Sequence, residues 1–392
     1  MRVVYLTHNG AGTALVRSQV LPYLRRLAAL GVDLRLVTFE RDGTATAPLG
    51  FHWRPIRAMA GGGLLAKALD IVTGFAVTIG LLARGGRLVH ARSYVPAAIA
   101  WAARLVLRRP YLFDMRGFLP EEYVEGGHWR EGELRHRVLV FAERVLLRDA
   151  AAIVTLTHRG AKRLRTEARY ARAVGTKPIA VIPCAVDLER FAPATGRPGA
   201  PTLLYAGSVG MWYELDAMLR VFALARHEIP SLRFLILNVG QHALISERVA
   251  AHGLGTSVDL GSGTYEEMPT LIGRAHVGIC LLRQASSKLG SSPIKVAEYL
   301  ACGLPVIVNR GQGDTDALVT EHGAGHVLAD YSDEELIRAA GALRELLADP
   351  GAGLRARALA ESEYSADRAA EIYLRLYREI DAAGGGGDPR AR

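Results

Sequence analysis

The sequence is poor in cysteine: it has three cysteines in 392 residues, Cys184, Cys280 and Cys302. Their number is odd and their spacing fits no metal-ligand pattern, which argues against a disulfide framework and against a structural zinc site. A chain without disulfides is typical of a reduced compartment, so the sequence predicts a cytosolic protein.

Motifs that bind a catalytic metal are lacking as well. There is no H-x-x-x-H, no D-x-D in a plausible loop, and no Ser, His and Asp combination with a defensible arrangement. We therefore predict no metal site and no cofactor.

Lysine is scarce, since only five of the 48 Lys and Arg residues are lysines, and the formal net charge is +9. Arginine in a chain rich in Ala and Gly is a weak indication of nucleic-acid binding, and we predict no nucleic-acid partner. The segment 130–172 has eleven Lys and Arg against five Asp and Glu. This local excess predicts contact with an anionic membrane surface, with a solvated helix face as an equally good interpretation.

Long apolar runs are few. The first residues, MRVVYLTHN, lack the apolar segment of a signal peptide. In the most apolar stretch, 64–83, Lys67 and Asp70 interrupt the run and leave 71–83, which is too short to cross a bilayer. We expect a buried helix there, with a helix that touches the membrane as the alternative, so peripheral attachment to the inner face of a membrane stays open.

What the sequence does contain is an alternation of strands and helices. Val3–Thr7 is an apolar run typical of a central parallel strand, a helix is expected from about Leu15 to Leu30, and VDLRLVTFE follows as the next strand. The length and the half-hydrophobic composition predict two such α/β domains. The loop after the first strand contains Gly10, Gly12 and Thr13, where doubly wound domains place ligands. Glycines that only form a tight turn are the alternative, since no G-x-x-G continuation follows.

Two further strands of the first half end in charged residues. The strand at 87–93 ends at Arg92 and Ser93, and the strand at 110–117 delivers Asp114 and Arg116. Because ligands bind at the carboxyl ends of parallel strands, these residues are candidates for a site. Structural ion pairs are the alternative.

The most informative stretch is SSKLGSSPIKVAEYLACGLPVIVNRGQGDTD, residues 286–316. Pro293 at a first turn favours a helix from there to about Ala301, and Gly303 ends it. The apolar run 306–308 follows as a buried strand, and Asp314 and Asp316 are expected in a loop.

This helix start has the features of a nucleotide site. Free N–H groups and the positive end of the helix dipole attract phosphate, beside Ser291 and Ser292. Lys295 adds a cation, and Glu298, three residues later on the same face, can accept hydrogen bonds from ribose hydroxyls. The alternative is a surface pair of Lys and Glu.

With these residues the chain resembles the retaining glycosyltransferases of the GT-B fold, in the large family-four group. Their donor motif runs into a helix and an A-x-G-x-P-V turn, matched by Ala301, Gly303, Pro305 and Val306. The second glutamate of that motif falls on Glu298. The first falls near Gly290, so Ser291, Ser292 or Lys295 would replace its contact with the sugar.

The resemblance implies two Rossmann-like domains that face a cleft, with a last helix that crosses back to the first domain. The expected ranges are 1–195 for the acceptor side, 196–362 for the nucleotide-sugar domain, 363–381 for the returning helix and 382–392 for a disordered tail. It also implies a nucleotide-sugar donor, a glycan or lipid-linked acceptor, and transfer with retention and without a metal.

Two further departures bear on catalysis. Relatives have an Arg and a Lys after the first strand of the second domain, where this chain has Gly207, Ser208 and the segment VGMWYEL. Relatives also have a sugar-binding histidine near the position of Asp114 to Arg116, which this chain lacks there. Hydroxyl and backbone donors at Gly207 and Ser208, with Lys295 or Lys288, would then stabilise the leaving diphosphate. Two alternatives are a non-catalytic glycosyltransferase-like subunit and a nucleotide-sugar epimerase of related fold.

Overall fold

The computed structural model describes residues 1–41, 50–59, 64–197 and 199–385. The chain forms two compact units, residues 1–183 with the chain after 365, and residues 184–365. The chain passes from the first unit to the second after Pro183, earlier than the boundary expected at 195. Val186 and Phe191 are already buried in the core of the second unit.

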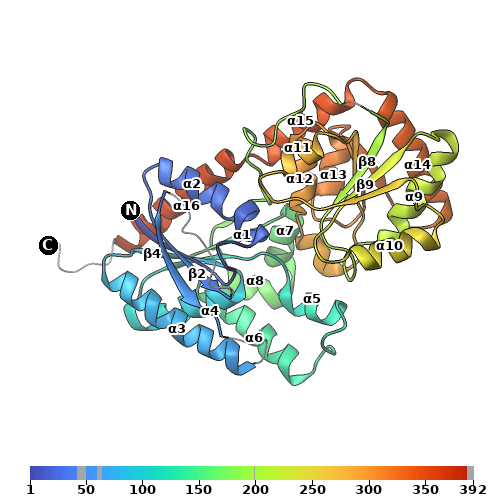
Figure 1. Ribbon diagram of the computed structural model, residues 1–392. Helices are drawn as coiled ribbons and strands as arrows, with labels where there is room; N and C mark the ends of the chain where they lie inside the picture. The colour runs from blue at the N-terminus through green and yellow to red at the C-terminus, as the bar shows by residue number, and fades with distance from the viewer. Residues whose placement is uncertain (42–49, 60–63, 198, 386–392) are drawn as a thin grey trace. The chain divides into compact units, whose positions relative to one another are not determined.

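The first unit is built on a parallel sheet of seven strands in the order β3-β2-β1-β4-β5-β6-β7 (Figure 1). The strands are β1 (Arg2–Thr7), β2 (Asp33–Glu40), β3 (His52–Arg57), β4 (Leu88–Arg92), β5 (Tyr111–Asp114), β6 (Ala152–Thr155) and β7 (Ile179–Val181). The inner strands are buried along their whole length, as expected of a parallel sheet covered on both faces.

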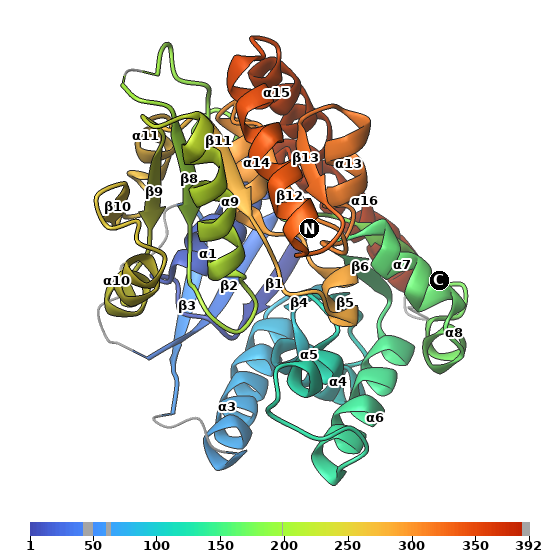
Figure 2. The same cartoon turned by 90° about the vertical axis from the view of Figure 1, so that its right-hand side faces the viewer.

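Helices cover both faces of this sheet. They are α1 (Ala14–Gln19), α2 (Leu21–Ala29), α3 (Leu64–Ala83), α4 (Tyr94–Leu107), α5 (Leu119–Glu125), α6 (Leu134–Asp149), α7 (His158–Thr166), α8 (Ala168–Val174) and α16 (Ala366–Gly385). α16 packs against α2 on one face, whereas α3, α4, α6 and α8 lie in sequence on the other (Figures 1 and 2).

Two helices differ from the expectation. The helix expected at 15–30 is divided into α1 and α2 at Val20, because Pro22 at the start of α2 has no N–H to donate. α3 has the expected length, but Leu65, Leu69 and Val72 are exposed on it, so the expectation of a buried helix is wrong for its outer face.

The returning helix expected at 363–381 is α16. It is helical to Gly385, so the first residues of the expected disordered tail belong to the helix, and residues 386–392 lie outside the described part of the chain.

The second unit is a parallel sheet of six strands in the order β10-β9-β8-β11-β12-β13. The strands are β8 (Thr202–Ala206), β9 (Arg233–Leu237), β10 (Val258–Gly261), β11 (Val277–Cys280), β12 (Val306–Asn309) and β13 (Gly325–Leu328). The helices are α9 (Leu215–Glu228), α10 (His242–Ala251), α11 (Met268–Ile272), a 3₁₀ turn η1 (Ser286–Gly290), α12 (Ile294–Ala301), α13 (Thr315–Glu321), α14 (Asp333–Ala348) and α15 (Ala352–Glu363).

α9 packs on α14 over one face of this second sheet (Figure 2). α12 packs on α15. The strand expected at 306–308 is β12, and α12 begins and ends where Pro293 and Gly303 predict. Asp316, expected in a loop, lies instead in the first turn of α13, where its carboxylate accepts a hydrogen bond from the N–H of Gly311.

Candidate active site

The turn after β8 and the first turn of α12 meet at Lys295. Its ammonium group lies 3.1 Å from the hydroxyl of Tyr205 and 3.5 Å from the centre of the Tyr213 ring. Lys295 is 7% exposed and has no carboxylate within ion-pair distance among the described residues. Burial lowers its pKa to about 8, and Cys280 and Glu298 oppose this fall.

Gly207 makes room for this lysine. A Cβ built on Gly207 would stand 2.6 Å from the ammonium nitrogen of Lys295, and the φ of Gly207, +137°, is strained for any other residue. The N–H of Gly207 donates to the carbonyl of Leu237 at 2.8 Å. Gly207 therefore contributes space rather than the free N–H donor that the sequence suggested.

Glu298 lies one turn further along α12 and is also 7% exposed. Its carboxylate has no hydrogen-bond partner among the residues that the structure describes. Burial raises its pKa to about 8, and Lys295 opposes this rise. A carboxylate and an ammonium that are both buried and both short of partners are costly, and a bound ligand would remove the cost.

The predicted serines surround the start of α12. Ser292 is nearly buried, and its hydroxyl accepts a hydrogen bond of 3.1 Å from the N–H of Cys184. Its own O–H remains a donor. Pro293 is the N-cap of α12 and supplies no side-chain cap, and the N–H of Ser291 donates to the carbonyl of Lys288. Ser208 is exposed.

Aromatic rings hold both lysines of this region, and sequence reasoning missed them as site residues. The Lys288 ammonium lies 3.6 Å from the centre of the Trp212 ring, and that of Lys295 lies over Tyr205 and Tyr213. Such contacts between a cation and the face of an aromatic ring stabilise the positive charge. Trp212 and Tyr213 belong to the segment VGMWYEL, which replaces the Arg and Lys of relatives. That replacement was the feature of the sequence that could have indicated a role for these two rings.

In the first unit, the loop after β1 is held by Glu40. Glu40 accepts a hydrogen bond of 2.9 Å from the N–H of Ala11, and a Cβ on Gly10 would stand 2.6 Å from its carboxylate. Thr13 caps α1 by accepting from the N–H of Val16. Gly12 has open space around it. Thr13 thus stabilises the start of α1. Glu40, which the sequence did not indicate, fixes this loop.

β4 and β5 bring the other candidates together. Arg92 of β4 lies opposite Asp114 of β5 in the parallel sheet. The N–H of Ser93 donates to the main-chain carbonyl of Asp114 at 2.9 Å. The side-chain oxygen of Gln19 accepts from Arg92 at 2.9 Å and from Arg116 at 3.5 Å. Gln19 was not expected in the site, and nothing in its spacing identifies it.

Asp114 is 1% exposed, and its carboxylate contacts three groups: Arg116 and His90, each at 3.4 Å, and the hydroxyl of Tyr373 at 3.3 Å. Burial alone would raise its pKa, but Arg116 and His90 hold the pKa well below its usual range. Burial lowers the pKa of His90, and Asp114 opposes this fall. The geometry favours a positioning role for Asp114 over contact with substrate.

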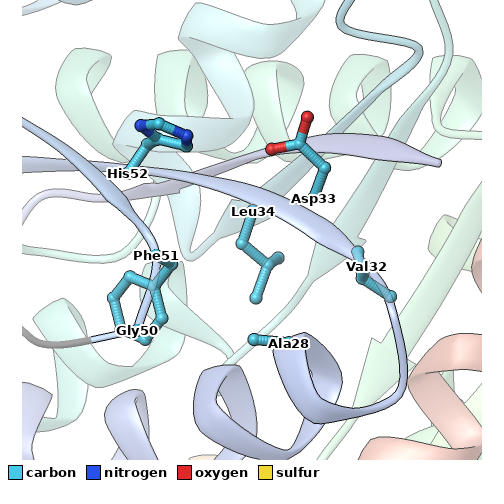
Figure 3. Close-up of a pocket in the computed structure, with 7 residues that line it drawn as sticks. All are labelled: Ala28, Val32, Asp33, Leu34, Gly50, Phe51 and His52. Carbon is cyan, nitrogen blue, oxygen red and sulfur yellow. The ribbon is translucent and has the colours of Figure 1, made fainter.

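A pocket of about 390 Å³ lies at the amino ends of β2 and β3, where Leu34 and Ala28 face each other beside Phe51 (Figure 3). It contains none of the predicted site residues. Parallel sheets bind ligands at their carboxyl ends, so this pocket is not the candidate site. Within the described ranges, no three His, Cys, Asp or Glu side chains are grouped so that they could hold a metal ion.

Known structures share this fold, in which each unit is built on a parallel sheet. Sucrose-phosphate synthase from Thermosynechococcus elongatus is similar with a TM-score of 0.75 and 19% identity over 97% of this chain and 99% of that one. A glycosyltransferase from Rickettsia africae gives 0.67 and 14% over 97% and 98%. Anabaena HepE, solved with UDP and glucose, gives 0.69 and 14% over 96% and 99%. The fold is that of the GT-B glycosyltransferases, which confirms the fold class expected from the sequence.

Family models assign the chain more narrowly. Residues 189–363 match the glycosyl transferases group 1, and residues 16–185 match a glycosyl transferase 4-like domain. The chain belongs to the group 1 glycosyltransferases, and its reaction class is glycosyl transfer. A search of curated protein sequences gives no match.

Proposed function

We propose that the protein transfers a hexose from a nucleotide-sugar to a glycan or lipid-linked acceptor, with retention of anomeric configuration and without a metal or other cofactor. One observation carries the proposal: Lys295 and Glu298 are both more than nine-tenths buried, on one turn of α12, and neither has an ion-pair partner among the described residues. A nucleotide-sugar has complementary groups for both. The likeness to HepE, which was solved with UDP and with UDP-glucose, supports such a donor.

In this proposal the donor diphosphate binds at the start of α12, beside Lys295 and the hydroxyl of Ser292. The helix dipole and the ammonium group stabilise the negative charge that develops as the bond between the anomeric carbon and the phosphate oxygen breaks. Glu298 accepts hydrogen bonds from the ribose hydroxyls. Gly207 has its role through Lys295, since it leaves the space which that side chain fills.

The acceptor hydroxyl attacks the anomeric carbon from the face that the phosphate leaves, and its proton passes to the leaving phosphate oxygen. Such a step requires no protein base, and the protein acts by positioning and by charge stabilisation. Arg92, Ser93 and the loop of Gly10 and Gly12 are proposed for the acceptor side. Arg116 is proposed for the acceptor side as well, and Asp114 positions its guanidinium group.

The test is a panel of nucleotide-sugars based on UDP, GDP and ADP. The matching nucleotide should raise the melting temperature by mass action, and the matching nucleotide-sugar should release free sugar slowly in water. Turnover should survive EDTA. Glu298→Gln and Lys295→Met should each lose at least tenfold in nucleotide affinity or turnover, whereas Glu334→Gln and Lys162→Met, at exposed positions, should match the wild type.

The alternatives give other results. Nucleotide binding without any sugar release, with or without an acceptor, would indicate a binding subunit. A sugar whose configuration changes while it stays attached to the nucleotide would indicate an epimerase. If Glu298→Gln left both binding and turnover unchanged, the site assignment would be wrong. The anomeric coupling constant of the first transfer product, measured by NMR, decides between retention and inversion.

We also propose a cytoplasmic protein that attaches peripherally to the inner face of the membrane, through the outer face of α3, α4 and α6. Leu134, Val138 and Phe141, spaced as i, i+4 and i+7 along α6, are 78%, 58% and 67% exposed. Leu65 and Leu69 are exposed on α3. A row of apolar side chains on a helix surface is typical of interfacial binding.

Charge favours an anionic bilayer as the occupant of this face. The segments 64–83, 94–109 and 134–149 contain eight Lys and Arg residues and three Asp and Glu residues. Two of those acidic residues, Asp70 and Glu143, are buried and so do not repel a membrane.

α3 alone is long and apolar enough to span a bilayer among the described helices. Asp70 on it accepts from the N–H of Met59 and pairs with His8, which ties α3 into the first unit.

A further inference from the structure

Arg92 is a buried cation without an anionic partner. It ends β4, is 5% exposed, and forms no ion pair with any carboxylate among the described residues. Within the described ranges its one hydrogen bond goes to the neutral side chain of Gln19, and its Nε is buried with no partner there. Because a buried charge is costly unless it is paired, an unpaired arginine at this depth indicates a ligand that supplies the counter-charge.

A second guanidinium adjoins it. The same oxygen of Gln19 accepts from Arg116 at 3.5 Å, so both cations lie around one atom. Asp114, the carboxylate beside them, is already engaged by Arg116, His90 and Tyr373. Its nearest contact to a guanidinium is 3.4 Å, to Arg116 rather than to Arg92. Arg92 helps to lower the pKa of Asp114, but the two side chains form no ion pair among the described residues. Two guanidinium groups beside one carboxylate leave the local charge positive.

Ser93, the residue after Arg92, has a strained backbone conformation. Ser93 has φ +72° and ψ −176°, outside the ordinary regions for a residue with a side chain. It is the N-cap of α4, a helix of 14 residues, and its hydroxyl forms no capping hydrogen bond. Strain of this kind persists where function requires it, and the uncapped helix start adds positive potential beside Arg92.

We propose that Arg92, with Arg116 and the first turn of α4, binds an oxyanion, a phosphate monoester or a carboxylate, carried by the acceptor. The inference rests on the proposed function, and it narrows the acceptor to an anionic molecule. An arginine fork matches either oxyanion through two parallel hydrogen bonds. All the residues of this site belong to the first unit, whereas those of the proposed donor site belong to the second.

The test uses the full chain with Lys295→Met, so that phosphate binding at the donor site is removed. Inorganic phosphate and acetate are titrated by calorimetry into this protein and into the same protein with Arg92→Met. We expect Arg92→Met to weaken the preferred anion at least tenfold. Arg104→Gln, in the last turn of α4, is the matched control and should have no effect. The two anions decide between a phosphate and a carboxylate.

A stability measurement separates ligand binding from a structural role. If Arg92 serves a ligand, Arg92→Met should keep or raise the melting temperature of the free protein, since an unpaired buried charge is removed. A fall in melting temperature together with unchanged anion binding would overturn the proposal, and so would the absence of binding by both anions at millimolar concentration.

The donor assays keep the two proposals distinct. Nucleotide binding that depends on Lys295 and Glu298 tests the proposed function, and Arg92→Met should leave it unchanged. If the anion site fails while nucleotide binding holds, only the nature of the acceptor is wrong. If nucleotide binding fails while Arg92 still binds phosphate, the glycosyl-donor assignment is wrong.

Discussion

The ammonium group of Lys295 lies where a side chain on Gly207 would begin, at 2.6 Å from the position of its Cβ. The two residues come from different elements, and each determines what the other can be. Gly207→Ala should therefore displace Lys295 and strain a backbone at φ +137°. We expect at least a tenfold loss in nucleotide affinity, measured by calorimetry or thermal shift.

Gly240→Ala is the control for backbone strain alone. Gly240 has φ +84°, and no atom lies within 4 Å of a Cβ built on it. It should lower stability by about 1 kcal/mol and leave nucleotide affinity unchanged. Equal affinities for Gly207→Ala and the wild type would show that Lys295 does not depend on this space.

The pKa values of the buried pair predict an unusual dependence of stability on pH. Burial raises the pKa of Glu298 from 4.5 to about 8, so between these values the unfolded chain has lost a proton that the folded protein retains. Stability contributed at Glu298 should therefore fall as pH rises through this window. Lys295 has the opposite effect between about pH 8 and pH 10.5, where the unfolded chain retains a proton that the folded protein has lost. The stability contributed at Lys295 should therefore rise with pH in this window.

Melting temperature measured against pH checks this prediction. Glu298→Gln should flatten the curve between pH 4.5 and 8, and Lys295→Met should flatten it above pH 8. Glu334→Gln, at an exposed position of α14, should follow the wild type. Parallel curves for wild type and Glu298→Gln would mean that the carboxyl titrates normally.

A buried polar cluster attaches the last helix to the first unit. Tyr377 on α16 contacts His90 at 2.6 Å, and Tyr373 on the same helix contacts Asp114. All four side chains are at most 1% exposed. Tyr377→Phe leaves a ring nitrogen of His90 without a partner and should cost about 1 to 3 kcal/mol of unfolding free energy.

Urea unfolding measures that cost, and hydrogen exchange in α16 shows whether the helix opens locally. Tyr123→Phe is the control, because the Tyr123 ring stacks on Trp129 and no hydrogen bond of its hydroxyl is observed in the described part of the chain. A loss of the same size in both variants would argue against the cluster as the attachment of α16.

The sequence predicts those features that depend on neighbouring residues. α12 begins after Pro293 and ends before Gly303 as expected, because both signals are local. The parallel strands follow from their apolar runs. The division of the helix at Val20 was missed although Pro22 was visible, since the apolar pattern continues through it.

The surroundings of the candidate site could not be predicted, because they depend on contacts between distant segments. Lys295 was expected as a phosphate ligand, but its burial depends on Tyr205, 90 residues away in the sequence. Asp114 was expected as a candidate site residue, and its carboxylate accepts a hydrogen bond from Tyr373, 259 residues away. No spacing rule joins such residues. The departure of this chain from its family's motif at VGMWYEL showed only that another arrangement was needed.

The outer face of α6 provides a direct test of membrane attachment. Phe141 is 67% exposed, and a negative charge there would be repelled by an anionic surface and would remove apolar area from the interface. Phe141→Glu and Val138→Glu should each weaken sedimentation with vesicles that contain anionic lipid, at least fivefold. Ile337→Glu, at an exposed apolar position of α14 in the second unit, is the matched control and should bind vesicles as the wild type does.

Binding should also fall with added salt, since part of it depends on arginines in 134–149. Equal sedimentation of all variants, or none with anionic vesicles at low salt, would exclude this face as a membrane contact, and donor hydrolysis measured in the same samples would show that the variants remain folded.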